Sequence, residues 1–553
     1  MTETYDAIVV GGGHNGLTAA GYLAMAGRKV VVLERREIVG GPCSVVEYFP
    51  GYTAAITNSP GSLEPKIVAD LRLADFGLRW HHPDPSMVMP FPDSRAFVAW
   101  RDRAKVMEVL RSFSPRDAEG YHRIFEFFER FAERIGVSLF EPPPSLAELA
   151  SRLTTPEDEE AFARIFFGSM RDLLDEHLES EELKAVIAIV GIMSNRVGPW
   201  WPGSGYFLLH RPMSLVSYGA GGAADPRRQL LRGSTGLPYG GMGAITAAMR
   251  RSIEASSATV RTGCEVVQIL VRDGRATGVA LASGEEIRAP VVLSNLAPKT
   301  TLLDLLPRDS LESTFREKLE KQKIEGNAFK VGLALDGIPR FAAARDEHMV
   351  EAFAACQFRI SPSLEYLERA NDDAKFGRPS QGPIVWGLTP SVADPGLAPA
   401  GRHIMTLSVF HAPYRLAEGD WAQERERFGR RVIDTCAEYI PNLKDIIIDT
   451  RFWSPKDIED EFGTIEGNIT HGDILPANHF SLRPFAGWSD YRTPVRGLYL
   501  CGVGTWPGGN VSGIPGHNAS QQVLADLATG LDRIDVSGRP GIVGTPQAEA
   551  QPC

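Results

Sequence analysis

The chain has 553 residues, enough for a large core and two or more lobes. Its hydrophobic content of 43 % and charged content of 23 % are ordinary for a globular protein, while its net charge of −11 argues against nucleic acid as a partner. No apolar run of about 18 residues occurs and the first strand begins very early, so we expect no transmembrane helix, no signal peptide and a cytoplasmic location.

The N-terminal stretch predicts a dinucleotide-binding unit. Ala7–Val10 is a short apolar run that suits a buried parallel strand, and a helical pattern covers residues 17–26. Between them Gly11, Gly13 and Gly16 form G-x-G-x-x-G. In this motif the first glycine allows a tight turn, the second lets the backbone approach a pyrophosphate, and the third lets the helix pack close to the strand.

The acid after the next strand indicates which dinucleotide binds. A strand is expected at residues 29–33, and Glu34 at its end is placed to accept hydrogen bonds from a ribose diol, which argues against NADP. The glycine pair 40–41 is typical of FAD-first folds of the glutathione-reductase type. We therefore expect FAD, bound in this stretch by Gly11, Gly13, His14, Asn15, Gly16, Glu34, Arg35, Gly40 and Gly41.

Helical patterns dominate residues 64–230. One helix carries an apolar and aromatic stripe, which either packs in the core or forms a wall of an apolar substrate tunnel or a membrane-touching face. The apolar run 183–193 is short, which favours a buried helix over a membrane span. The stripe consists of Tyr121, Ile124, Phe125, Phe128, Phe131 and Ile135.

From residue 239 the pattern is again that of a nucleotide domain. A glycine-rich turn opens a helix expected at 244–255, and alternating residues predict a small antiparallel unit with a turn at Asp273-Gly274. Val291–Ser294 predicts another buried strand. No second G-x-G-x-x-G follows a strand, so we expect no separate NAD(P)H domain. The expected cofactor contacts here are Gly241, Met242 and Val266.

Strands at Phe329–Leu335 and 404–410 and a helix at 423–439 predict a second part of a substrate lobe. Near the C-terminus a buried strand ends in a glycine-rich loop, and a helix then runs to about residue 527. Backbone N–H groups at that helix N-terminus suit the N1–C2=O edge of a flavin, where they favour hydride uptake at N5. The expected contacts are Gly502, Gly504, Gly513 and Ile514.

Three segments together resemble the phytoene desaturase (carotenoid dehydrogenase) family of FAD oxidoreductases. They are the N-terminal fingerprint, Tyr239-Gly240-Gly241-Met242-Gly243, and the C-terminal Gly-Leu-Tyr-Leu-Cys-Gly-x-Gly-Thr-x-Pro-Gly-Gly. Gly467-Asn468-Ile469, His471-Gly472-Asp473 and Ser481-Leu482-Arg483-Pro484 look most like its branch of pyridine nucleotide-disulfide oxidoreductase domain proteins. The branch name does not fit the six scattered cysteines, because none forms the C-x-x-C pair of a dithiol centre.

The resemblance implies an α/β protein with a Rossmann-like FAD domain of the glutathione-reductase type, built from discontinuous segments, and an α+β substrate lobe. We place the FAD domain at residues 1–63, 235–307 and 485–535, the lobe at 64–234 and 308–484, and a disordered tail at 536–553. One departure is Pro42, where many relatives carry Arg. A basic contact to the FAD phosphates would then be missing or supplied elsewhere, for which Arg35 or Arg36 is available, although both also suit the protein surface.

The resemblance also implies removal of a hydride and a proton from a hydrophobic substrate, for instance a polyene or isoprenoid, with oxygen, a quinone or another compound as electron acceptor. The candidate catalytic residues are His471, Asp473, Trp506 and His517, and no spacing suggests a metal. A flavin amine oxidase, a redox-neutral double-bond isomerase and a flavin-binding interaction protein are the alternatives. Peripheral membrane contact and oligomer formation are left open.

Overall fold

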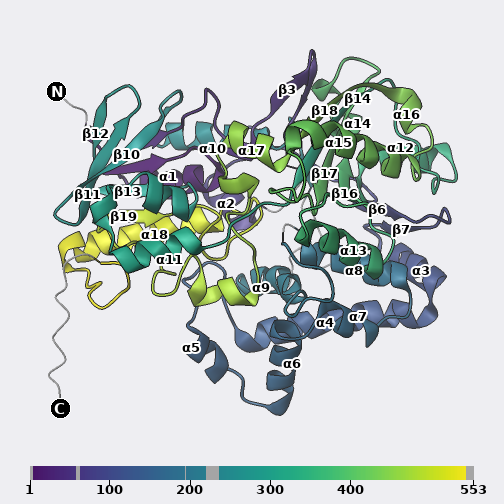
Figure 1. Ribbon diagram of the computed structural model, residues 1–553, viewed down its shortest axis with the longest axis horizontal. Coiled ribbons are helices and arrows are strands. Elements are labelled where there is room, and N and C mark those ends of the chain that lie inside the picture. Colours follow the sequence, from purple (N-terminus) through teal and green to yellow (C-terminus); the bar gives the residue numbers. More distant parts are fainter. Residues whose placement is uncertain (1–3, 58–62, 194, 220–235, 543–553) are drawn as a thin grey trace.

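The computed structural model describes residues 4–57, 63–193, 195–219 and 236–542. Figure 1 shows a smaller parallel sheet with its helices at one end of the molecule and a larger sheet with helices beneath it at the other end. The two parts are assembled from interleaved stretches of the chain. This is the α/β architecture with discontinuous segments that the sequence predicts, while the domain boundaries given above remain a prediction.

The smaller sheet is parallel throughout, and β1 lies at its centre. Its central strands are short runs of Val, Ile, Leu and Ala that are buried along their whole length, as expected for a sheet covered on both faces. The strands come from three distant stretches of sequence. In sheet order they are β19 (Leu498–Leu500), β13 (Val291–Ser294), β1 (Ala7–Val10), β2 (Val30–Leu33) and β9 (Thr259–Arg261).

Three helices cover this sheet: α1 (His14–Met25), α10 (Gly243–Ala255) and α18 (Ile514–Thr529). A separate antiparallel unit packs beside it, formed by β10 (Val266–Arg272), β11 (Arg275–Leu281) and β12 (Glu286–Arg288). Its turn has left-handed backbone at Asp273 and Gly274, with φ of +50° and +71°, which confirms the predicted hairpin.

The larger sheet has seven strands, and one of its faces forms a separate apolar core with α12 (Glu347–Ala355) and α15 (Trp421–Ala437). The predicted strand Phe329–Leu335 is present as β14, and every one of its residues is buried. In sheet order the strands are β18 (Ile447–Trp453), β14 (Phe329–Leu335), β17 (His403–Phe410), β16 (Ile384–Leu388), β15 (Gln357–Ile360), β6 (Met87–Pro90) and β7 (Ala96–Ala99).

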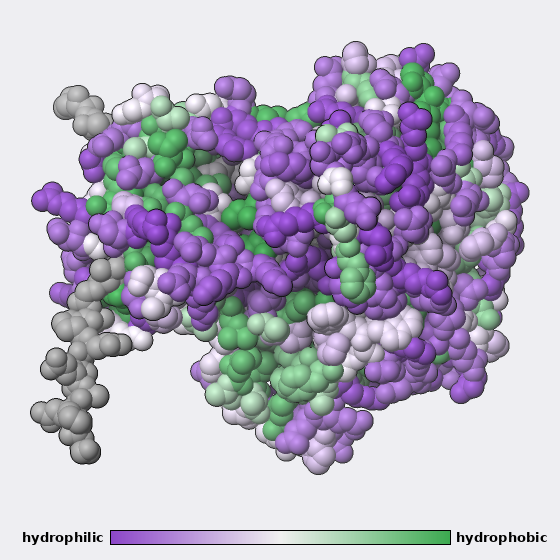
Figure 2. All heavy atoms as spheres, in the orientation of Figure 1, coloured by the Kyte–Doolittle hydropathy of each residue, from purple (hydrophilic) through white to green (hydrophobic). Residues whose placement is uncertain are grey.

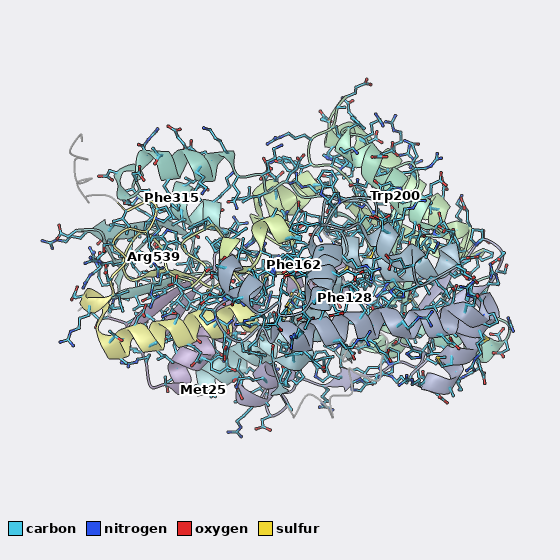
Figure 3. The ribbon with its side chains drawn as sticks, turned by 90° about the horizontal axis from the view of Figure 1, so that it is seen from below. Met25, Phe128, Phe162, Trp200, Phe315 and Arg539 are labelled. Atoms are coloured by element: carbon cyan, nitrogen blue, oxygen red, sulfur yellow. The ribbon has the colours of Figure 1, made fainter. Side chains whose placement is uncertain are left out.

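A helical layer lies below the larger sheet in Figure 1. The predicted stripe belongs to its longest helix, α4, and five of its six side chains are buried in the core, with Phe125 partly buried. Figure 3 shows Phe128 on this helix. Core packing is therefore the correct interpretation of the stripe. The helices are α3 (Arg103–Phe113), α4 (Pro115–Ile135), α5 (Leu146–Ser151), α6 (Pro156–Phe166), α7 (Met170–Asp175), α8 (Glu181–Ile192) and α9 (His210–Val216).

The apolar run 183–193 forms α8, which is buried as predicted. Across the described ranges, no helix combines the length and the hydropathy needed to cross a membrane. The other elements are α2 (Pro65–Asp70), α11 (Ser313–Lys321), α13 (Leu364–Lys375), α14 (Pro390–Ala393), α16 (Leu443–Ile446), α17 (Pro455–Phe462), β3 (Val46–Phe49), β4 (Tyr52–Ala54), β5 (Trp80–His81) and β8 (Leu237–Pro238).

The first residues of the expected tail pack on the protein. Val536 is buried, Trp488 Nε1 donates to the carbonyl oxygen of Pro540 at 2.8 Å, and Arg539 pairs with Asp490 at 2.9 Å. Figure 3 shows Arg539 at the end of the molecule that holds the parallel sheet. The prediction of disorder from residue 536 onward is therefore wrong for residues 536–542. Their composition alone could not show that Val536 is buried or that Pro540 accepts a hydrogen bond from Trp488. Residues 543–553 lie outside the described ranges.

Candidate active site

An extended cavity of about 290 Å³ opens where β1, β2 and β13 end. Val10, Leu33 and Asn295, at or just after the carboxyl ends of these strands, all line it. Ligands of open α/β sheets bind at this edge, because the carboxyl ends of parallel strands meet there. The volume is far above the roughly 10–15 Å³ that one water needs, so the cavity suits an extended ligand.

The glycine loop has the geometry that its motif predicts for the first and third positions. Gly11 has φ of +95°, and a Cβ at Gly16 would lie 2.2 Å from the carbonyl oxygen of Gly11. A Cβ at Gly13 would lie 2.6 Å from Asn295 Nδ2, so the second glycine makes room for that amide at the cavity wall. Any side chain at these positions would push the helix or the amide away from the cavity.

Glu34 is buried at the edge of the cavity with both carboxylate oxygens held by the backbone. Gly12 N–H donates to Oε2 at 2.8 Å, and Arg36 N–H donates to Oε1 at 2.9 Å. Arg35 and Arg36 line the same end. These hydrogen bonds fix the carboxylate at the cavity edge, where it could accept hydrogen bonds from a ribose diol. Arg35 and Arg36 line the cavity together with Pro42, the position at which many relatives carry Arg.

Several buried polar atoms along the cavity have no hydrogen-bond partner among the described residues. Such atoms are costly unless a ligand or water bonds them, so the cavity fits a long polar ligand such as FAD. The atoms are His14 Nε2, both amide atoms of Asn15, Thr464 Oγ1 and His471 Nδ1. Burial lowers the pKa of His14 to about 4 and that of His471 to about 3, so both imidazoles are neutral at pH 7.

We call the part of the wall that is formed by Met193, Phe207, Ile474, Val503 and Val511 the inner end of the cavity. These five side chains are apolar, and the polar Asn195 lies beside them, because its Oδ1 accepts a hydrogen bond from Ile474 N–H at 2.7 Å. His471 is the candidate catalytic residue that reaches the cavity. Its backbone is left-handed, with φ of +54°.

The structure does not bring the other candidate catalytic residues to the cavity. Asp473 lies behind the wall, bonded to Arg196 at 3.3 Å, and burial raises its pKa. Trp506 stacks on Phe480 with ring centroids 5.0 Å apart, and its Nε1 donates to a carbonyl oxygen. His517 Nδ1 lies 2.7 Å from Asn518 Oδ1, while its ring packs edge-on against Tyr22. Core packing places both rings, and neither of them lines the cavity, so a catalytic role for Trp506 or His517 stays a prediction.

Most of the cofactor contacts expected from the two later glycine-rich segments do not line the cavity. Gly241 and Met242 are not part of its wall. A Cβ at Gly241 would lie 3.0 Å from Val45, so this glycine lets the segment after Gly41 approach α10. Gly502, Gly504, Gly513 and Ile514 are likewise absent from the wall, and a Cβ at Gly502 would lie 2.6 Å from Asn295 O.

The C-terminal loop instead reaches the cavity through Val503, Gly509, Asn510 and Val511. Of the expected contacts, the wall includes Gly11, Gly13, His14, Asn15, Glu34, Arg35, Gly40, Gly41 and Val266. Asn295, Leu296 and Thr464 were missed. Asn295 follows a predicted strand directly, which is a usable signal, whereas Thr464 follows α17 in the substrate lobe and has no motif around it.

This combination of a fixed acid, unpartnered polar atoms and an apolar inner end defines an FAD-dependent oxidoreductase. The model of the flavin containing amine oxidoreductase family matches residues 16–339, and the chain belongs to that family. It is 34 % identical over 560 aligned residues to pyridine nucleotide-disulfide oxidoreductase domain-containing protein 2 of Rattus norvegicus, covering 95 % of this chain and 94 % of the relative.

A second relative is the neurosporene-forming phytoene desaturase of Rhodobacter capsulatus, at 27 % identity over 94 % of this chain and 93 % of the relative. The resemblance to phytoene desaturases is thereby confirmed. Among solved structures, putrescine oxidase bound to putrescine is similar in fold, with a TM-score of 0.59 at 14 % identity over 96 % of this chain and 100 % of that chain.

Replacing Glu34 by Gln tests the acid at the cavity edge. Because hydrogen bonds to charged groups contribute about 1.5–3 kcal/mol, we expect FAD to bind about 10- to 100-fold more weakly. Fluorescence titration of the apoprotein with FAD measures this. Glu37→Gln, an exposed acid on the same loop, is the matched control and should bind FAD normally. Equal affinity in both variants would remove Glu34 from the cofactor site.

The two neutral histidines predict a pH dependence of stability. Each has a folded-state pKa below the unfolded value of 6.5, so the unfolded chain binds more protons and stability falls as the pH drops from 6.5 toward about 4 for His14 and 3 for His471. Each contributes a slope of up to about 1.4 kcal/mol per pH unit. In urea unfolding of the apoprotein between pH 6.5 and 4.5, His14→Gln and His471→Gln should each show a shallower slope. An unchanged slope would mean that the ring is not desolvated.

Proposed function

We propose that this FAD-dependent oxidoreductase dehydrogenates an uncharged isoprenoid or polyene hydrocarbon. The observation that carries the proposal is the apolar inner end of the cavity, which continues directly from the polar part that suits the dinucleotide. An apolar chain gains about 25 cal/mol for each Å² that it buries there, whereas a charged group would lose its hydration. The phytoene desaturase relative supports the same substrate class.

The cofactor supplies the hydride acceptor of such a reaction. In this chain, Glu34 would hold the ribose diol and the loop from Gly11 to Asn15 would hold the pyrophosphate. Met193, Phe207 and Ile474 would align the hydrocarbon and exclude water. His471 Nδ1 is the atom assigned to receive the proton, because His471 lines the cavity and its Nδ1 has no hydrogen-bond partner among the described residues.

An amine oxidase is the second candidate, supported by the family model and by the similarity in fold to putrescine oxidase. A protonated amine needs a carboxylate or an aromatic cage. At the inner end, the described lining residues offer one aromatic ring, Phe207, and no carboxylate, while Trp506 is turned into the core. These features favour the hydrocarbon.

The test is anaerobic addition of single compound classes to the FAD-loaded enzyme. Isoprenoid hydrocarbons should bleach the oxidised-flavin absorption bands, and alkyl amines should not. Phe207→Ala should weaken the apparent affinity for the hydrocarbon by about 10-fold or more, since burying a Phe side chain contributes about 1.5–3 kcal/mol. Phe376→Ala, at an exposed ring far along the chain from the lining residues, is the matched control.

Bleaching by amines alone would replace the proposal by the amine oxidase. Rearrangement of the hydrocarbon by the reduced enzyme, without net oxidation, would indicate an isomerase. Bands that respond to neither class would favour a flavin-binding interaction protein. Whether oxygen or a quinone reoxidises the enzyme follows from adding each to the bleached protein.

We also infer contact with a lipid surface as the source of such a substrate. Phe167 is 68 % exposed and Trp201 is 46 % exposed, and their turns are joined by a hydrogen bond from Gly203 N to Gly168 O. Figure 2 shows hydrophobic side chains over α5 and α6, and Phe167 directly follows α6. Exposed aromatic side chains of this kind suit the interface between headgroups and acyl chains.

Flotation with phosphatidylcholine vesicles tests this contact. The full chain should float with the vesicles, and the double variant Phe167→Ala/Trp201→Ala should bind several-fold less. Ile448→Ala, at a residue 45 % exposed on β18 at the edge of the larger sheet, is the control. Equal flotation of all three proteins, or none, would contradict the contact.

A further inference from the structure

Arg483 is a buried cation that the reaction described above does not use. It belongs to the Ser481–Pro484 segment that marks the family resemblance, and only 3 % of its surface is exposed. All four of its hydrogen-bond acceptors are main-chain carbonyl oxygens, so no carboxylate in these contacts neutralises the guanidinium. The Asp473 carboxylate acts on the guanidinium electrostatically, but its own ion pair is with Arg196, so Arg483 is bonded only to carbonyl dipoles. Burying a charge in this way is costly and calls for a role that offsets the cost.

The four contacts join the two loops that form the inner end of the cavity. Nη2 donates to Thr470 O at 2.9 Å and to Val503 O at 2.7 Å, and Thr470 and Val503 both line the cavity. Nη1 donates to Asp473 O at 3.0 Å, and Nε donates to Thr505 O at 3.3 Å. One planar side chain with five donors in fixed directions thus sets the spacing of both loops.

The contacts also bracket His471. Thr470 O and Asp473 O lie on either side of the His471-Gly472 turn, and His471 has a left-handed backbone that is unfavourable for a non-glycine residue. Fixing the carbonyl groups on both sides keeps this turn in place. The imidazole is thereby kept in the cavity wall, with Nδ1 buried and without a hydrogen-bond partner among the described residues.

A glycine in the opposite loop makes room for the guanidinium. A Cβ at Gly508 would lie 2.7 Å from Arg483 Nε, and Gly508 has φ of +70°. The loop therefore approaches Arg483 so closely that any side chain at position 508 would collide with the guanidinium. A lysine could not reproduce the arrangement, because its single ammonium group cannot span four carbonyl oxygens on two loops.

We infer that Arg483 is the positioning residue of the flavin end of the cavity: it holds His471 in its reactive orientation and places a fixed positive charge behind the redox-active part of the cofactor. The inference rests on the proposed function for the role of His471. The charge stabilises the more negative, reduced form of a flavin over the oxidised form. The positioning role and the electrostatic role can be separated in an experiment, because lysine at position 483 keeps the positive charge but not the four hydrogen bonds.

The test compares Arg483→Lys and Arg483→Met in the FAD-loaded full chain. Both should fold and retain FAD, and both should lose at least tenfold in kcat with little change in KM, because the His471 turn is released. Arg483→Met alone should show a midpoint potential that is more negative by about 30 mV, which corresponds to a tenfold loss of preference for the two-electron-reduced cofactor. The potential is measured by dye equilibration and needs no substrate.

Two further variants keep the test informative. Gly508→Ala presses on the guanidinium without removing it and should lower kcat in the same direction. Arg152→Met removes another arginine that donates to main-chain carbonyls, at the end of α4, and should leave both readouts unchanged. If the wild type does not oxidise hydrocarbons but Arg483→Met shifts the potential, the proposed substrate fails and the electrostatic role stands. Folded Arg483 variants with wild-type kcat and potential would overturn the inference.

Discussion

The pairing of β1 with both β2 and β13 is the constraint on which the rest of the structure depends. These strands come from distant stretches, and parallel pairing brings their carboxyl ends to one edge of the sheet. The glycine loop, Glu34 and Asn295 follow those ends and therefore meet at one cavity. Because β19 pairs with β13, the C-terminal loop is brought to the same edge. The site is thus a consequence of strand order rather than of any local segment.

Burial gives this site its electrostatic character. His14 and His471 are neutral because the surrounding protein offers no solvation for an imidazolium, and Arg483 remains charged because four carbonyl dipoles face it. Burial lowers the pKa of Arg483 only to about 10, which leaves the guanidinium protonated at neutral pH. A neutral imidazole and one buried guanidinium therefore lie near the apolar end of the cavity, while the charged Glu34, Arg35 and Arg36 line the other end. Such a setting suits a reaction in which an uncharged substrate gives up a hydride to its neighbour.

The local elements of the nucleotide domain could be predicted because each rests on short-range physics. Buried strands such as Ala7–Val10 are continuous apolar runs, and Gly11 and Gly16 are required by a turn and by a close approach within a few residues. The site residues were harder to predict. Glycines at 241 and 502 match the family motifs, and in the structure each of them accommodates a neighbouring chain segment. Thr464 reaches the cavity only because α17 lies against the first domain, which no local pattern encodes.

The two ends of the cavity differ enough to fix the direction in which a dinucleotide lies. Glu34, with both oxygens oriented by backbone N–H groups, can accept hydrogen bonds from a diol but would repel the electron-rich carbonyl edge of a flavin. Met193, Phe207 and Ile474 at the other end would leave a ribose without partners, whereas they can contact the ring system and the substrate beside it. The reversed orientation would set the Glu34 carboxylate against an electron-rich carbonyl edge and leave the sugar without polar partners. The same asymmetry favours a meeting of cofactor and substrate at the apolar end, next to His471 and the loops that Arg483 joins.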